Sequence, residues 1–195
     1  MGSEMCIRDR LCKLAEKAFG DLQKPNLPHQ SRAAAFSGGE FRRDKKLEQA
    51  HFALAFESPS YKSRDIYTAQ VYSIALGGGM SSRLFQQIRE KRGLCYSIFA
   101  QAGAFSDTGF TTIYAGTSAE QIPDLANLTV NELKRATLDL SEAEVTRARS
   151  QMKAGLLMGL ESPSSRAERL ARMIQIWGKV PSLDETIEKL SLIHI

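Results

Sequence analysis

The sequence predicts an α+β domain in which helices pack on one face of a mostly antiparallel sheet. Residues 49–57 alternate larger and smaller side chains with a period of two, as a strand does. Apolar residues recur at helical spacing in several later segments. The resulting order is strands, helices, a hairpin and then helices. A chain of 195 residues with 43% hydrophobic content can bury the core of one main domain.

The two ends of the chain differ in character from its middle. Residues 1–10 lack periodicity and a targeting pattern, residues 191–195 form an abrupt and mostly apolar tail, and we interpret both as non-native flanks. Residues 11–20 have helical spacing and a final glycine, as expected for the tail of a preceding domain. Residues 21–33 contain prolines and few apolar anchors, which indicates a linker. The predicted domain covers residues 34–190 and is expected to be truncated at its C-terminal end.

The first half of this domain is predicted to contain four strands and two helices. Alternation predicts strands over residues 35–42, 49–57, 94–102 and 109–116, the last two joined as a hairpin. Helical spacing starting near Tyr67 predicts a helix that the glycines 77–79 end, and a shorter helix follows over residues 82–92.

The second half is predicted to be helical. Capping boxes begin at Ser141 and Ser182, and Pro163 opens a helix that Gly178 ends. The apolar stripe of that helix is expected to face the core, and it consists of Ala167, Leu170, Ala171 and Ile174.

Charge and cysteine content argue against several function classes. The 26 Lys+Arg and 22 Asp+Glu residues give a net charge of +4, but no RNA-binding or Cys/His finger pattern accompanies them, so we expect no nucleic-acid partner. Cys6, Cys12 and Cys95 are odd in number and lack paired spacing, which argues against a disulfide framework. No stretch approaches the roughly 18 consecutive apolar residues of a membrane span.

The most informative segment is residues 76–97, which contains a glycine turn, an amphipathic helix, a glycine stop and the entry into a strand. Arg89 is expected on the flank of the helix and Tyr96 at the start of the strand, so the stop at Gly93 can bring both side chains to one rim. Spacing alone favours another interpretation, in which Arg89 pairs with a neighbouring Glu on the surface and Tyr96 packs with strand residues.

The same segment resembles the second-domain signature of the pitrilysin, insulinase and mitochondrial-processing-peptidase family of zinc metallopeptidases, closest to the bacterial and mitochondrial processing-peptidase branch. The resemblance extends from the linker to Leu190. It includes residues 37–40 (SGGE), 107–109 (DTG) and 161–163 (ESP).

The resemblance implies a role for both side chains. In that family an Arg and a Tyr seven positions apart reach the zinc site of a neighbouring domain, and those positions are Arg89 and Tyr96 here. Peptide hydrolysis builds negative charge on the carbonyl oxygen, so Tyr96 would donate a hydrogen bond to it. Arg89 would bind a backbone carbonyl of an extended peptide substrate. The implied partner is an N-terminal catalytic domain of the same chain or a homologous subunit, in the bacterial cytoplasm or the mitochondrial matrix.

Neither the glycine run nor the histidines match a known phosphate or zinc motif. Gly77, Gly78 and Gly79 lack the spacing of a phosphate loop, and a tight connection between helices is favoured, with contacts to substrate as the alternative. Neither H-x-x-E-H nor H-E-x-x-H occurs, and the three histidines are His29, His51 and His194. We therefore expect no metal to be bound by this chain, with zinc in the full-length parent, and no activity of the chain alone.

A second function stays open from the sequence. The same fold serves as a non-catalytic subunit or scaffold in the family, including the processing-peptidase partner subunit and the core proteins of respiratory complexes, so Arg89 and Tyr96 could persist without a catalytic role.

Overall fold

The structure is a computed structural model that describes residues 2–23 and 32–191. It divides the chain into two compact units, Met1–Arg32 and Ala33–Ile195. His29, His194 and most of the predicted linker and C-terminal flank lie outside the described residues.

The described residues of the first unit form the helix α1 (Gly2–Phe19), whose side chains from residue 7 onward are exposed. The helix begins nine residues before the helical segment predicted at residue 11. Residues 2–10 contain no proline and several good helix formers, so nothing in this stretch interrupts the helix. The assignment of this segment to a flank and to a preceding domain stays a prediction.

The second unit is built on a three-stranded antiparallel sheet with the order β1-β3-β2. The strands are β1 (Ala50–Ser58), β2 (Ser97–Ala104) and β3 (Gly109–Thr117). Residues 35–42, predicted as a strand, have no regular structure and are exposed. This segment contains Gly38 and Gly39, which offer no side chain to pack and weaken a strand.

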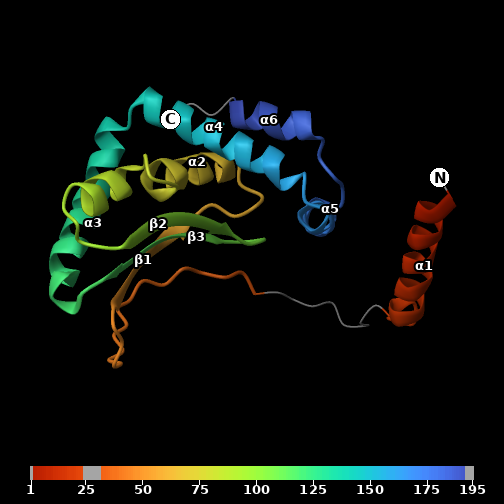
Figure 1. Cartoon of the computed structure of the whole chain (residues 1–195), viewed down its shortest axis with the longest axis horizontal. Helices are drawn as coiled ribbons and strands as arrows, with labels where there is room; N and C mark the ends of the chain where they lie inside the picture. The colour runs from red at the N-terminus through yellow and green to blue at the C-terminus, as the bar shows by residue number, and fades with distance from the viewer. Residues whose placement is uncertain (1, 24–31, 192–195) are drawn as a thin grey trace. The chain divides into compact units, whose positions relative to one another are not determined.

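Helices cover one face of this sheet, which confirms the predicted α+β fold class. Figure 1 shows α2 (Ile66–Gly77) next to the sheet, with α4 (Glu142–Gly159) and α6 (Leu183–Ser191) stacked beyond it. The remaining helical elements are α3 (Ile122–Asp139), α5 (Pro163–Trp177) and the short turns η1 (Phe85–Glu90) and η2 (Ala119–Gln121).

The core lies in two layers between these elements. One cluster joins the sheet to η1 and α3, through buried residues that include Leu76, Leu84, Ile88, Ile98, Ile113 and Leu125. The other joins α2, α4 and α6, through Val71, Ala75, Val145, Ala148 and Leu190. The capping boxes at Ser141 and Ser182 are present as predicted.

Helix α5 differs from its prediction because none of its residues is buried. Leu170 and Ile174, expected in the core, are 43% and 56% exposed. An amphipathic pattern predicts an apolar stripe but does not say which surface covers it. None of the helices in the described part of the chain is both long and apolar enough to cross a membrane.

Candidate functional site

The predicted site lies where η1 passes into β2. The turn η1 is a π-helix, and the backbone N–H of Lys91 donates to the carbonyl of Gln86, five residues earlier. The sequence predicted an ordinary helix here, and single π turns of this kind are frequent at functional sites. Gly93 then adopts a positive φ of 62°, which glycine tolerates best, and the chain reverses into the strand.

Arg89 and Tyr96 meet across this junction. The guanidinium carbon of Arg89 lies 5.5 Å from the ring centroid of Tyr96 and 4.5 Å from that of Phe85. Both distances are in the range of cation–π contacts, so the guanidinium is held against two aromatic rings. Phe85 was not identified from the sequence, although its position four residues before Arg89 on one helical face is a signal for such a contact.

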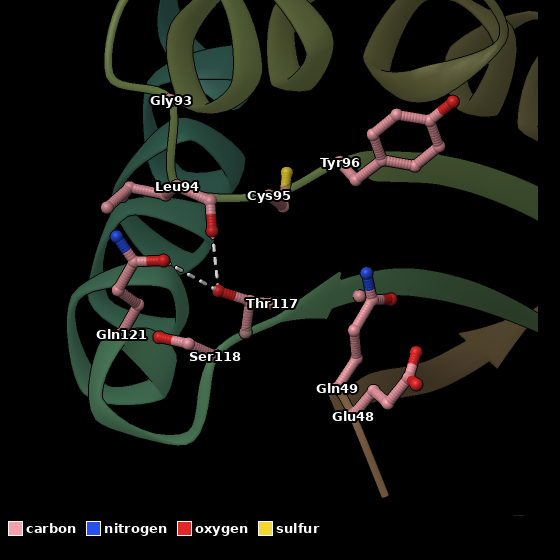
Figure 2. Close-up of a pocket in the computed structure, with 10 residues that line it drawn as sticks. Glu48, Gln49, Gly93, Leu94, Cys95, Tyr96, Thr117, Ser118 and Gln121 are labelled. Carbon is pink, nitrogen blue, oxygen red and sulfur yellow. Dashed lines mark hydrogen bonds between the residues drawn. The ribbon is translucent and has the colours of Figure 1, made fainter.

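The two side chains differ in burial, and their role in a site stays a prediction. Tyr96 is 76% exposed, whereas Ile98 and Ala100, next on the same face of β2, are buried. Tyr96 directly precedes β2, and Figure 2 shows its ring on the helical side of the sheet. In the described part of the chain Arg89 has no ion pair, so the predicted alternative of an Arg–Glu surface pair is absent there.

A shallow polar pocket of about 290 Å³ opens beside Tyr96, at the end of the sheet. Its wall combines the junction, the end of β3 and the residues that precede β1 (Figure 2). It is lined by Glu48, Gln49, Gly93, Leu94, Cys95, Tyr96, Gly116, Thr117, Ser118 and Gln121. The pocket was not predicted, because it depends on how the three strands align at this end.

The glycine run packs between β2 and α4. A Cβ on Gly77 would lie 2.3 Å from the backbone nitrogen of Ala100, so only glycine allows this approach of α2 to β2. The side chain of Gln151, on α4, donates to the carbonyl of Gly78 at 2.6 Å and lies against Gly79. These contacts fit the favoured interpretation of a tight connection, and contact of the run with substrate stays a prediction.

Arg83 anchors the segment just before η1. Its role was not predicted from the sequence. Its side chain is 11% exposed and bonds both carboxylate oxygens of Glu144, at 2.5 and 2.8 Å, together with Asp139. The hydrogen bonds from Arg83 lower the pKa of the Glu144 carboxyl to about 2. These bonds connect the segment just before η1 to the connection between α3 and α4.

His51 and Cys95 show no sign of metal or nucleophile chemistry. His51 hydrogen-bonds through Nδ1 to the hydroxyl of Tyr114 at 2.7 Å. Cys95 is buried, and this burial raises the pKa of its thiol. Over residues 7–23 and 32–191, no three His, Cys, Asp or Glu side chains converge in a way that could hold a metal ion. The residues described therefore do not fit a zinc site.

Comparison with known proteins identifies the fold and the family. Residues 8–152 match the peptidase M16 inactive domain. The zinc protease YmxG of Bacillus subtilis is 34% identical over 190 residues, which cover 97% of this chain and 46% of that protein. A zinc protease of Rickettsia bellii is 36% identical over 181 residues, which cover 92% and 44%. The chain thus spans about half the length of the curated relatives it matches.

Solved structures agree with this result. A chain of complex III2 from Candida albicans superposes with a TM-score of 0.79 and 27% identity, over 93% of this chain and 46% of that one. A protease from Helicobacter pylori shares the fold with a TM-score of 0.73 and 19% identity, over 95% and 46%. The family resemblance predicted from residues 76–97 is confirmed, and this chain belongs to the peptidase M16 family through its inactive domain.

Proposed function

We propose that this chain is the substrate-binding half of a zinc metalloendopeptidase and supplies Arg89 and Tyr96 to a zinc site on another domain. That domain belongs to the same polypeptide or to a homologous subunit. The observation that carries the proposal is the contact between the guanidinium of the partly exposed Arg89 and the ring of Tyr96, which is 76% exposed. Under this proposal the compartment is the bacterial cytoplasm or the mitochondrial matrix.

The two side chains would perform different tasks. The phenol of Tyr96 is 76% exposed, so its hydroxyl is free to donate to the substrate carbonyl oxygen as negative charge develops there. The Arg89 guanidinium would donate to a backbone carbonyl of the peptide, and its stacking on Phe85 limits the orientations it can adopt. Zinc would supply the activation of water for peptide hydrolysis.

The sheet offers a place for an extended peptide. Strand β2 pairs with β3 on one side and is an edge strand among the strands described. Because Tyr96 directly precedes β2, a peptide that lies along this edge would pass next to its ring.

A second candidate function is a non-catalytic subunit that uses the fold as a scaffold. The likeness to a chain of the Candida albicans complex III2 favours it, at a TM-score of 0.79 and 27% identity. The names of the curated relatives, which are zinc proteases, favour the catalytic proposal.

Reconstitution tests the catalytic proposal. The chain would be joined to the part of the Bacillus subtilis relative that it does not match, and the chimera assayed for zinc content and for hydrolysis of a fluorogenic peptide library. We expect zinc-dependent hydrolysis, and we expect Arg89→Ala to raise KM roughly 10-fold or more through loss of a charge-assisted hydrogen bond.

Arg172→Ala is the matched control, because Arg172 is exposed and its guanidinium carbon lies 5.5 Å from the ring centroid of another tyrosine, Tyr61, and it should leave KM unchanged. A chimera that folds and binds zinc but hydrolyses no peptide in the library would contradict the catalytic proposal and support the scaffold.

A further inference from the structure

We propose that Thr117 is a positioning residue for Tyr96, which it holds in place through a hydrogen bond to the backbone two residues before it. This inference rests on the proposed function and adds a residue to the same site. Thr117 is the last residue of β3, on a different element from Arg89 and Tyr96.

Thr117 lies at the point where the pairing between β2 and β3 stops. The β2–β3 ladder ends at the pair Ser97 and Gly116. Beyond it, the backbone N–H of Tyr96 still donates to the carbonyl of Gly116, at 3.3 Å. Residues 91–95, which precede Tyr96, connect this end of the sheet to η1. Thr117 extends the connection past the end of the ladder, because its hydroxyl donates to the carbonyl of Leu94 (Figure 2).

The Thr117 side chain is held rigidly. Thr117 is 4% exposed, and its backbone pairs with Ala50 of β1, so it is fixed in the middle strand of the sheet. Its branched Cβ restricts rotation about χ1. The Oε1 of Gln121 is a second possible acceptor for the same hydroxyl proton, at 3.3 Å, but the contact with the Leu94 carbonyl is the shorter of the two. The direction of the Thr117 hydroxyl is therefore set by the sheet and not by the junction that it holds.

Few side-chain contacts hold Tyr96 in place. Its ring is 76% exposed, so packing restrains it weakly, and its place depends on the backbone of residues 93–96. That segment starts at Gly93, whose positive φ suits glycine, and the backbone N–H groups of Gly93 and Leu94 donate to the carbonyls of Arg89 and Ile88. Within the described chain, the Thr117 hydroxyl makes the one side-chain hydrogen bond to these four residues. Loss of this bond would let the junction shift and move the Tyr96 hydroxyl relative to Arg89.

The test compares Thr117→Val with Thr117→Ser in the zinc-binding chimera. Valine keeps the shape of threonine and removes the hydroxyl, whereas serine keeps the hydroxyl. Since a displacement of about 1 Å in a catalytic group can cost 100-fold in rate, we expect Thr117→Val to lower kcat roughly 10- to 100-fold and to leave KM within about 2-fold. Thr117→Ser should recover most of the lost kcat.

Thr111→Val is the matched control for a purely structural effect. Thr111 lies on the same strand, is 2% exposed, and donates its hydroxyl to Ser58 at 3.2 Å, away from the junction. It should lower Tm about as much as Thr117→Val and leave kcat unchanged. If the two valine variants lose kcat equally, Thr117 has no specific positioning role and the inference is wrong.

A readout that does not depend on activity uses the 195-residue chain itself. Nuclear Overhauser contacts between the Arg89 side chain and the Tyr96 ring should weaken in Thr117→Val and persist in Thr117→Ser and Thr111→Val. Unchanged contacts in Thr117→Val would overturn the inference. If Tyr96→Phe lowers kcat but Thr117→Val does not, the positioning role alone fails. If Tyr96→Phe has no effect on kcat, the proposed function fails and the positioning role fails with it.

Discussion

Among single residues, Arg83 has the most extensive electrostatic contacts described in the structure. Its guanidinium bonds Glu144 and Asp139 while its side chain is only 11% exposed. Two hydrogen bonds to one carboxylate hold the planar group in a defined orientation. Because Arg83 stands between the glycine run and η1, it fixes the start of the turn that carries Arg89.

This network predicts a specific pH dependence of stability. The pKa of Glu144 is about 2 in the folded chain, below its usual 4.5, chiefly because Arg83 bonds the charged form. A lowered folded-state pKa gives a stabilisation that is complete above about pH 4.5 and is lost as the pH falls toward 2. Urea unfolding of the wild-type chain and of Glu144→Gln should therefore give a difference in free energy that shrinks over this range.

The control for this dependence is Arg83→Met, in which the pKa of Glu144 should rise toward its usual value, while the hydrogen bonds from Ser141 still lower it. In that background, the effect of Glu144→Gln on the free energy of unfolding should vary less between pH 4.5 and 2 than it does in the wild-type chain. A difference that stays constant with pH in the wild-type background would show that the ion pair does not stabilise the fold.

At the scale of elements, the contact between α2 and β2 depends on Gly77. A Cβ at this position would come within 2.3 Å of the Ala100 nitrogen and 2.9 Å of the Phe99 carbonyl carbon, so the two elements would have to move apart. We expect Gly77→Ala to lower the free energy of unfolding by about 1–3 kcal/mol, as overpacking does.

Gly155 is a matched position on α4, where an added Cβ would meet nothing within 4 Å. Gly155→Ala should raise the free energy of unfolding by roughly 0.5–1 kcal/mol, because alanine is the better helix former. Guanidinium unfolding of both variants measures the two changes. Equal effects of the two substitutions would mean that the close approach of α2 to β2 does not matter.

The sequence predicted where helices and strands form better than it predicted which surfaces they pack against. Period-two alternation predicted β1, β2 and β3, and the capping box at Ser141 predicted the start of α4. The burial of α5 was wrong, because an apolar stripe such as Leu170 and Ile174 shows which side could be covered and not whether it is.

The candidate site was predictable only where it is local in sequence. Arg89 and Tyr96 lie seven positions apart with one glycine between them, so their proximity follows from a helix, a stop and a strand. The contact of Thr117 with Leu94 spans 23 residues and depends on the register of β3 against β2. A shift of one residue would turn the Thr117 side chain to the other face, and no local pattern determines that choice.

At the scale of the whole molecule, the chain is a peptidase M16 inactive domain that spans about half the length of its curated relatives. The described residues do not fit a zinc site, and the candidate site pairs the partly exposed Arg89 with the exposed Tyr96, which lines a shallow pocket. Under the proposed function, another domain would supply the zinc ligands, and Arg89 and Tyr96 would reach its site.

The most direct test of this account is kcat for Tyr96→Phe in the zinc-binding chimera. Phenylalanine keeps the ring that contacts Arg89 and removes only the hydroxyl, so zinc content, fold and KM should stay close to wild type. Loss of an oxyanion donor should lower kcat by about 100-fold or more. A Tyr96→Phe chimera that turns over substrate at the wild-type rate would contradict the account and leave the inactive domain as a scaffold.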